Sequence, residues 1–252
     1  MEGKIVGIGV GPGDPELITL KAAKLLKIAD VISVPKAHAK KPSLALTIVR
    51  DILAERERPP EMIRLVFPMT KDQDGLKRAW ARNAQILAEK AKKGKIVAFI
   101  TLGDPMFYST FIYLCQSIQE EFPEVKLEIV PGVTSLTACA ASSRIPLAKR
   151  EEIVAVIPSA TDLKQIEEIA KHANNLVLMK GTQRFKDLTS ILERSGFTKN
   201  STIALVRRCT MPEEKAIVGR LGDVSSWDIQ NDYFSMIIIK NSENEPWKGE
   251  AP

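Results

Sequence analysis

Cysteine and histidine are scarce in this sequence, and their scarcity excludes several kinds of site. The three cysteines, Cys115, Cys139 and Cys209, are widely spaced and form no Cys-x-x-Cys pair. An odd number of scattered cysteines predicts neither a disulfide framework nor a thiolate metal cage. The two histidines, His38 and His172, are too few and too far apart for a catalytic zinc centre. We therefore expect reduced, buried thiols and no protein-bound metal.

Long apolar runs are missing as well. The most extended uncharged stretch of note, residues 129–143, contains Pro131 and Gly132 and is shorter than the ~20 apolar residues that span a bilayer. The first residues, Met-Glu-Gly-Lys, lead into glycine-punctuated sequence without the basic and apolar regions of a signal peptide. These absences predict a cytoplasmic protein that has no membrane partner.

Neither sign of charge is in large excess. Lysine and arginine number 36 against 31 acidic residues, a formal net charge of +5. This balance indicates a mild preference for anionic partners, and it falls short of the basic tail that would predict a nucleic-acid partner. Hydrophobic residues make up 44% and charged residues 27% of the 252 positions, which excludes disordered, collagen-like and coiled-coil chains.

Short β-branched runs alternate with helical periods, the pattern of a parallel α/β architecture. Strands are expected at residues 4–10, 30–34, 62–67, 95–102, 126–130, 153–157, 176–180, 202–206, 215–220 and 234–240. Helices are expected at residues 16–28, 43–54, 75–93, 108–121, 135–142, 163–172 and 185–194. Because about five strands precede Pro131-Gly132, we expect two α/β domains, residues 1–131 and 132–252, the second with a polar tail at 241–252.

The first expected strand ends in a glycine-rich turn at residues 7–15, GIGVGPGDP. No register of this turn matches Gly-x-Gly-x-x-Gly, because the third glycine position falls on Pro12 or Asp14. The acidic residue that a dinucleotide-binding fold places ~20 residues onward is absent too, since the second strand runs into Pro35-Lys36. A nicotinamide-dependent oxidoreductase is therefore disfavoured. Asp14 and Pro15 are expected to cap the following helix.

Three later turns also follow strands and contain glycine. Residues 101–107, TLGDPMF, repeat the Asp-Pro pair at the carboxyl end of a buried strand, where open α/β sheets bind ligands. Residues 130–135, VPGVTS, place two hydroxyls before a helix of small residues, and Thr134 or Ser135 is equally a helix cap. Residues 176–181, LVLMKG, end a further strand, where Met179 either fills the core or contacts a ligand.

These four turns, in this order, resemble the tetrapyrrole methylase family, S-adenosylmethionine-dependent enzymes that alkylate uroporphyrinogen and precorrin rings. The resemblance covers nearly the entire chain. Residues 65–72, LVFPMTKD, residues 102–114, LGDPMFYSTFIYL, and the basic loop after Val34 are most similar to one branch of the family. That branch methylates C20 of precorrin-2 or of its cobalt complex, cobalt-factor II, in cobalamin biosynthesis.

The resemblance implies the fold of class III methyltransferases, with two α/β domains, the donor in the cleft between them, and a homodimer. It implies S-adenosylmethionine as methyl donor, released as S-adenosylhomocysteine. The donor-binding residues that it assigns are Pro12, Leu102, Gly103, Asp104, Phe107, Thr134, Ser135, Met179, Val206 and Cys209. In one respect the sequence departs from uroporphyrinogen methylases, because Pro35 stands where they have an acidic residue, so no proton-transfer role is carried over there.

The small-molecule tetrapyrrole implied by the resemblance carries acetate and propionate groups, which cationic side chains would orient. The candidates for this role are Lys36, His38, Lys40 and Lys41, then Arg150, Lys180, Arg184, Arg207 and Arg208. Each of them is otherwise an ordinary exposed cation. Tyr108 is a candidate for stabilising or deprotonating the ring, or else a packed tyrosine whose hydroxyl is hydrogen-bonded.

Two alternatives stay open at this point. In the first, the same fold and donor serve another acceptor: another corrinoid position, uroporphyrinogen or RNA, of which RNA would bind with steep salt dependence. In the second, the protein is a non-catalytic sensor that binds the donor. Methyl transfer itself needs no protein nucleophile or metal, because alignment of donor and acceptor supplies roughly 7–11 kcal/mol of the barrier.

Overall fold

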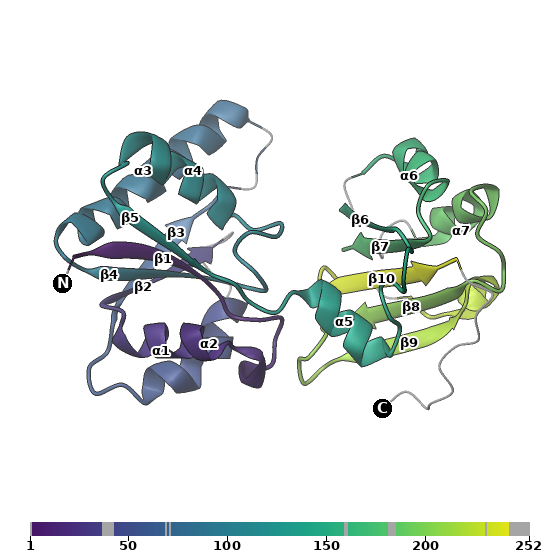
Figure 1. Cartoon of the computed structure of the whole chain (residues 1–252), viewed down its shortest axis with the longest axis horizontal. Helices are drawn as coiled ribbons and strands as arrows, with labels where there is room; N and C mark the ends of the chain where they lie inside the picture. Colours follow the sequence, from purple (N-terminus) through teal and green to yellow (C-terminus); the bar gives the residue numbers. More distant parts are fainter. Residues whose placement is uncertain are drawn as a thin grey trace. The chain divides into compact units, whose positions relative to one another are not determined.

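The computed structural model consists of two compact units, Met1–Thr134 and Ser135–Pro252 (Figure 1). It describes residues 2–36, 43–68, 70, 72–158, 161–180, 185–229 and 231–241, and only the backbone of Lys36 and of residues 185–187. Each unit has one five-stranded sheet with helices packed against it, which confirms the predicted α/β class. His38, Lys40, Lys41 and Arg184, and the expected tail from residue 242 onward, lie outside the described residues.

The first sheet has the strand order β3-β2-β4-β1-β5, and every pairing in it is parallel. Its strands are β1 (Lys4–Gly9), β2 (Val31–Lys36), β3 (Glu61–Val66), β4 (Ile96–Thr101) and β5 (Lys126–Val130). All six residues of β4 are buried, because this strand lies inside the sheet and is covered on both faces. A continuous apolar run is the expected sequence for such a strand.

Two pairs of helices cover the two faces of this sheet. The helices α1 (Leu20–Ile28) and α2 (Leu44–Ala54) pack against Val6 and Ile8 of β1. The helices α3 (Gln73–Lys92) and α4 (Phe111–Glu121) pack against Ile5 of the same strand, on the opposite face (Figure 1). The connections after β1 and β2 run toward one edge of the sheet and those after β3 and β4 toward the other, so right-handed crossovers place the two pairs on opposite faces.

The second sheet is mixed rather than parallel and has the order β6-β7-β10-β8-β9. Its strands are β6 (Val154–Pro158), β7 (Asn175–Met179), β8 (Thr202–Arg207), β9 (Lys215–Arg220) and β10 (Ser235–Lys240). Only β6 and β7 pair in parallel. The expectation of a parallel architecture was wrong here because no helix follows β8: a short loop leads to β9, and such a loop permits only antiparallel pairing.

Helices cover this sheet on both faces as well. The core that includes Leu176, Leu205 and Ile237 is packed against α6 (Leu163–Ala170), α7 (Phe185–Arg194) and the 3-10 helix η3 (Leu221–Ser226). On the other side, α5 (Ser135–Ser143) contacts β8, β9 and β10.

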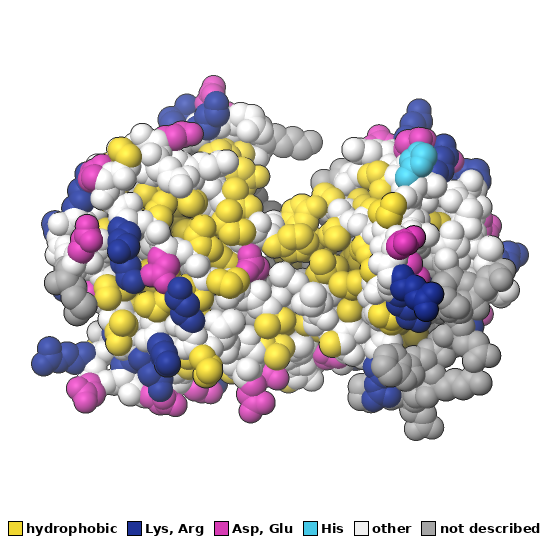
Figure 2. All heavy atoms as spheres, in the orientation of Figure 1, with side chains coloured by type: hydrophobic (Ala, Val, Ile, Leu, Met, Phe, Trp, Pro, Cys, Tyr) yellow, Lys and Arg dark blue, Asp and Glu magenta, His cyan; other side chains and the backbone are white. Residues whose placement is uncertain are grey.

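None of the helices among the described residues is long and apolar enough to cross a membrane. Basic and acidic side chains are interspersed on the visible face of each unit (Figure 2).

Two helix starts differ from the sequence-based expectation. The helix expected from residue 16 is split into a 3-10 turn, η1 (Pro15–Leu17), capped by Asp14, and α1, capped by Thr19. The helix expected from residue 108 begins at Phe111, because the backbone of Tyr108 has a φ of 51°, which no α-helix accommodates. The remaining elements are present with ends within two residues of those expected.

Candidate functional site

The first unit has a topological switch point at the carboxyl ends of β1 and β4. These two strands are neighbours, but the chain leaves β1 toward the β3 edge of the sheet and leaves β4 toward the β5 edge. In open α/β sheets, ligands bind in the crevice outside the strand ends at such a point. The first two glycine turns follow these two strands, and the third follows the adjacent strand β5.

The turns after β1 and β4 are hydrogen-bonded to each other. The N–H of Gly103 donates to the carbonyl oxygen of Gly11 at 2.8 Å, and the N–H of Gly11 donates back to the carbonyl oxygen of Gly103 at 3.3 Å. Gly103 has a φ of +68°, and a Cβ placed on it would meet no atom within 4 Å. This side of the turn therefore leaves the backbone open to a ligand.

The backbone of the turn after β5 lies directly against the backbones of strand β1 and of the turn after β4. A Cβ on Gly132 would lie 2.2 Å from the carbonyl oxygen of Gly103, and a Cβ on Gly9 would lie 2.7 Å from the nitrogen of Gly132. No real Cβ fits at such distances. Glycine at both positions is thus required for the three turns to meet.

A carboxylate also joins the second turn to the third. One oxygen of Asp104 accepts a hydrogen bond from the backbone N–H of Met106 at 2.8 Å, and the other accepts from the backbone N–H of Gly132 at 2.9 Å. The Asp104-Pro105 pair therefore does not start a helix, as its sequence likeness to Asp14-Pro15 suggested, but holds two turns together. In this structure Asp104 positions the turns, and its contact with a donor stays a prediction.

The structure brings together most of the donor-binding residues predicted in the first unit. Pro12 is buried beside the bridge between the first two turns, and Leu102, Gly103 and Asp104 form the second turn. Phe107 follows it and is half-buried, as is Thr134, the residue before α5. Their common location is the carboxyl edge of β4, β1 and β5.

In the second unit, two of the predicted donor-binding residues flank one strand. Met179 of β7 and Val206 of β8 are both paired with Met236 of β10, one on each side. Because β7 and β8 both run antiparallel to β10, their carboxyl ends share one edge of the sheet. The sequence could not predict that Met236 lies between Met179 and Val206, because this depends on which strand lies between β7 and β8.

Cys209 is placed differently from a ligand-facing side chain. It is 6% exposed, and its thiol contacts the buried thiol of Cys139 in α5, the helix that Ser135 begins. This contact, together with burial, raises the pKa of Cys139 far above its ordinary value. All three cysteines are free and buried, as expected. Because its thiol faces Cys139, Cys209 could contact a donor only through its backbone, and this contact stays a prediction.

The backbone is strained where β7 and β8 end. Lys180, Arg208 and Thr210 have φ values of 58°, 50° and 62°, which residues with side chains rarely adopt. The loop before β10 contacts the side chains of two of these residues: Arg208 donates to Asp232 at 2.8 Å, and the ammonium of Lys180 lies 4.3 Å from the ring centroid of Tyr233. Backbone strain of this kind collects at functional sites.

The carboxylate of Asp232 stays charged in this setting. Burial disfavours its charge, but hydrogen bonds from the Arg208 guanidinium and from the backbone N–H of Phe234 outweigh burial and lower the pKa of Asp232. The Arg208–Asp232 ion pair therefore persists at neutral pH.

The predicted substrate-binding cations are only partly described. Lys36 ends β2 with its side chain outside the described atoms, and His38, Lys40 and Lys41 follow in the segment that is not described. Arg207 is the last residue of β8 and is half-buried at the carboxyl edge of the second sheet. Arg150 is exposed in the loop between α5 and β6, with a φ of 51°.

Among the described residues, no three His, Cys, Asp or Glu side chains could together hold a metal ion.

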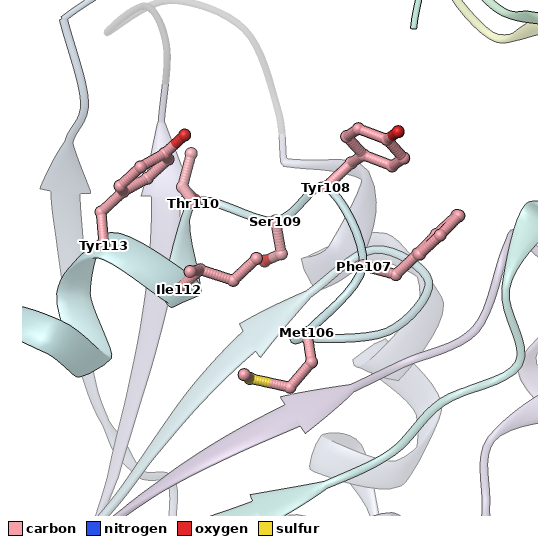
Figure 3. A pocket seen from close by; sticks show the side chains of 7 residues that line it. All are labelled: Met106, Phe107, Tyr108, Ser109, Thr110, Ile112 and Tyr113. Carbon is pink, nitrogen blue, oxygen red and sulfur yellow. The ribbon is translucent and has the colours of Figure 1, made fainter. Parts of the chain in front are cut away.

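Sequence reasoning missed most of a cavity beside the turn after β4 (Figure 3). The cavity has a volume of about 420 Å³ and is lined by Met106, Phe107, Tyr108, Ser109, Thr110, Ile112 and Tyr113. Only Phe107 and Tyr108 were site candidates. The available signal was the density of aromatic and hydroxyl residues between the Asp-Pro pair and the α4 helix, which was interpreted as the start of the helix and as part of the family resemblance, not as the lining of a cavity.

The fold and the meeting of glycine turns at the β1/β4 switch point are those of a methyltransferase with two α/β units. Residues 4–225 match the family described as Tetrapyrrole (Corrin/Porphyrin) Methylases, and the chain belongs to this family. The predicted family resemblance and fold are thereby confirmed.

Two relatives are similar over nearly their full length. The probable cobalt-precorrin-2 C(20)-methyltransferase of Methanocaldococcus jannaschii is 38% identical over 94% of this chain and 96% of that protein. The cobalt-precorrin-2 C(20)-methyltransferase of Salmonella typhimurium is 37% identical over 98% of this chain and 99% of that protein. Each alignment extends through both units, so the similarity to these relatives is not confined to the glycine turns of the first unit.

Solved structures are similar to both units. The uroporphyrin-III C-methyl transferase from Thermus thermophilus complexed with S-adenyl homocysteine is 26% identical, with a TM-score of 0.66 over 94% of this chain and 97% of that chain. A cobalt precorrin-4 methyltransferase has a TM-score of 0.71 over 94% of both chains at 24% identity, and this likeness concerns the fold alone.

Proposed function

We propose that this protein transfers a methyl group from S-adenosylmethionine to C20 of precorrin-2 or cobalt-precorrin-2 in cobalamin biosynthesis. The observation that carries the proposal is the near full-length likeness to two proteins named cobalt-precorrin-2 C(20)-methyltransferases, at 37% and 38% identity. The geometry of the first unit supports it, because three glycine turns meet where an open α/β sheet binds its ligand.

The residues at the switch point fit a methyl donor. When bound, S-adenosylmethionine would supply an activated methyl group: the bond between sulfur and the methyl carbon would break as the bond to the ring carbon forms, which would leave neutral S-adenosylhomocysteine. The open side of Gly103 allows the donor to approach the backbone, and the carboxylate of Asp104 holds this turn against Gly132. Pro12, Leu102, Phe107 and Thr134 are the remaining donor residues proposed in this unit. Their chemical task is to orient the donor and exclude water, rather than to supply a nucleophile.

The second unit contributes residues that we also assign to the donor. Met179 and Val206 flank Met236. Met179 is half-buried, and we propose that its side chain contacts the adenine or methionine part of the donor, whereas Val206 is buried and would contact the donor through its backbone. Ser135 begins α5, and Cys209 follows β8 with its thiol turned toward Cys139. For Cys209 we therefore propose a backbone contact.

The acceptor needs cations because of its acetate and propionate groups. We propose Lys36, His38, Lys40, Lys41, Arg150 and Arg207 for this role. Arg207 has the firmest structural support of the six, since it is half-buried at the strand end next to Val206. We further propose that the two units are two domains, predicted from the sequence as residues 1–131 and 132–252, with the boundary moved to the division of the compact units after Thr134. We also propose that the protein acts as a cytoplasmic homodimer.

The decisive experiment is methylation followed by mass spectrometry. The protein is incubated with S-adenosylmethionine and either precorrin-2 or cobalt-precorrin-2, and the product is expected to carry one added methyl group at C20. Running both substrates side by side determines whether cobalt must already be present. Methylation at another position would reassign the acceptor, and donor binding without turnover of either substrate would overturn the proposal in favour of a sensor.

A further inference from the structure

The chain between β8 and β9 turns twice before the second strand begins. The N–H of Met211 donates to the carbonyl oxygen of Arg208 at 2.9 Å, and the N–H of Glu214 donates to the carbonyl oxygen of Met211 at 2.9 Å. Because β8 and β9 are paired up to the last residue of one and the first of the other, these turns make up the whole connection, residues 208–214. Glu214, the residue before β9, is thereby brought back to the end of β8.

The carboxylate of Glu214 joins this connection to α5. One of its oxygens accepts a hydrogen bond from the backbone N–H of Thr210, and the other accepts one from the hydroxyl of Ser142 in α5. Hydrogen bonds to a carboxylate are about twice as strong as those between neutral groups. One side chain therefore links the end of β8 to the helix that contacts β8, β9 and β10 (Figure 1).

A second contact joins the same two elements. The thiol of Cys209 contacts the thiol of Cys139 in α5, and both residues are buried. Ser135, Cys139 and Ser142 are spaced at i, i+4 and i+7, so they share one face of α5. The face of α5 that contacts the connection thus has at its amino end Ser135, one of the residues proposed to bind the donor.

We propose that Glu214 is a positioning residue of the donor site. Its carboxylate holds the backbone around Cys209 against α5, and the donor contacts that backbone rather than Glu214. The inference rests on the proposed function, because Ser135 and Cys209 are donor-binding residues only as proposed there.

The backbone that Glu214 holds is the strained part of the connection. Arg208 and Thr210, on either side of Cys209, have φ values of 50° and 62°. Residues with side chains rarely adopt such conformations, which persist where the surrounding contacts favour them. On one side, Thr210 donates to Glu214. On the other, the N–H of Arg208 donates to the carbonyl oxygen of Phe234 at 2.7 Å, so the backbone of Cys209 is ordered before a donor binds.

Removing the carboxylate tests the proposal. Glu214→Ala breaks both hydrogen bonds, and part of the donor's binding energy must then order the connection. We expect the Kd for S-adenosylhomocysteine, measured by calorimetry, and the KM for S-adenosylmethionine to rise roughly 10-fold. The kcat at saturating donor should stay within about twofold of wild type, because Glu214 takes no part in the methyl transfer itself.

Glu214→Gln separates positioning from charge. The side-chain carbonyl oxygen of glutamine can accept from the N–H of Thr210, and its amide group can donate to the oxygen of Ser142, because a hydroxyl accepts as well as donates. Both links are retained with weaker, neutral hydrogen bonds, so we expect the donor Kd to stay within about threefold of wild type. A loss as large as that of Glu214→Ala would overturn the proposal, since the donor site would then require the negative charge itself.

Glu167→Ala is the matched control. Glu167 of α6 also joins two elements of the second unit through its carboxylate, which accepts from the guanidinium of Arg194 in α7 at 3.2 Å and 3.1 Å. Its removal should lower thermal stability slightly and leave the donor Kd within about twofold of wild type. Equal weakening of donor binding in Glu167→Ala and Glu214→Ala would show a general effect of stability and overturn the positioning role.

Thermal unfolding shows whether each variant is folded. If Glu214→Ala is not, Ser142→Ala takes its place, since it removes only the link to α5 and is expected to raise the donor Kd roughly threefold. An unchanged donor Kd in the folded variant overturns the inference. The proposed function fails by a different result, namely wild-type protein that binds the donor but methylates neither precorrin-2 nor cobalt-precorrin-2.

Discussion

The carboxylate of Asp104 accepts a hydrogen bond from the backbone N–H of Gly132 at 2.9 Å, so a side chain after β4 holds the turn after β5. Its other oxygen is occupied by the N–H of Met106. In the first unit the proposed donor residues extend from Pro12 to Thr134, and this one carboxylate fixes the relative position of two of the three turns that carry them.

Replacing Asp104 with asparagine tests that relationship. Asparagine retains one acceptor oxygen, but its amide NH2 group would face one of the two backbone N–H groups. Two donors cannot form a hydrogen bond with each other, so one of the two hydrogen bonds is lost. We expect a loss of about 1.5 kcal/mol in stability, the lower end of the contribution of a hydrogen bond to a charged group because these groups are not fully buried, and at least 10-fold weaker binding of S-adenosylhomocysteine. Calorimetry and thermal unfolding provide the two readouts.

The matched control for Asp104→Asn is Asp162→Asn. Asp162 likewise accepts a backbone N–H, that of Lys164 at 2.6 Å, but caps α6 in the second unit. This variant should lose some stability and leave donor affinity unchanged. Equal donor affinity in the two variants would contradict the positioning role of Asp104.

Gly132→Ala tests whether the close approach of the turns matters. The added methyl group would lie 2.2 Å from the carbonyl oxygen of Gly103, so one turn must move away from the other. We expect a stability loss of about 1–3 kcal/mol, typical of overpacking, and loss of measurable donor binding. Gly222→Ala is the comparison, because there the nearest atom is the Cβ of Lys199 at 3.2 Å. Donor binding by Gly132→Ala at wild-type affinity would show that the turns need not touch.

Acid sensitivity should depend on Asp30, the residue before β2. One oxygen of Asp30 accepts from the backbone N–H of Ile96, which lowers the pKa of this carboxyl below the ordinary 3.8 although burial opposes the shift. A carboxyl with a depressed folded-state pKa stabilises the protein above its unfolded-state pKa, and this contribution is lost as the pH falls through the folded-state value. Wild type should therefore lose stability steeply below about pH 4.

Asp30→Asn should flatten this part of the pH profile, because asparagine does not titrate. Denaturant titrations between pH 2 and pH 7 measure the effect. Identical slopes in wild type and Asp30→Asn below pH 4 would contradict the assignment.

The thiols of Cys139 and Cys115 should react slowly in the folded protein. The contact with Cys209 and burial raise the pKa of Cys139, and burial raises that of Cys115. Because the thiolate is the reactive form, less of it is present at any given pH. At pH 8 we expect labelling by a thiol reagent to be at least 10-fold slower than in the unfolded chain, as followed by peptide mass spectrometry. Labelling of Cys139 at the unfolded rate would show that packing of α5 against β8, β9 and β10 does not protect it.

Local features of the fold could be predicted from the sequence, and features that depend on tertiary contacts could not. Apolar runs such as β4 and the helical period of α3 are properties of adjacent residues, and their ends were predicted to within two residues. The start of α4 was not, because the left-handed backbone of Tyr108 follows from its surroundings rather than from its residue type. The position of β10 between β7 and β8 likewise depends on pairings between distant strands.

The same distinction holds for the site. The glycine turns were recognised as candidates, since glycine and Asp-Pro punctuate the sequence. Their contacts were not predictable, because a hydrogen bond from Gly132 to Asp104 or a ring of Trp80 stacked on Tyr113 joins residues 28 and 33 positions apart. The cavity after β4 escaped notice for this reason: only packing shows that its side chains surround a space.

The order of strands in the second sheet has a consequence for biosynthesis. During translation the first sheet has all its strands once β5 has left the ribosome, whereas the second sheet lacks its middle strand until β10 emerges, the last of the five. Until then β7 and β8 each expose an unpaired inner edge, the kind of surface through which nascent chains aggregate. The first unit can thus fold early in translation, whereas the second sheet can be completed only after β10 has been synthesised.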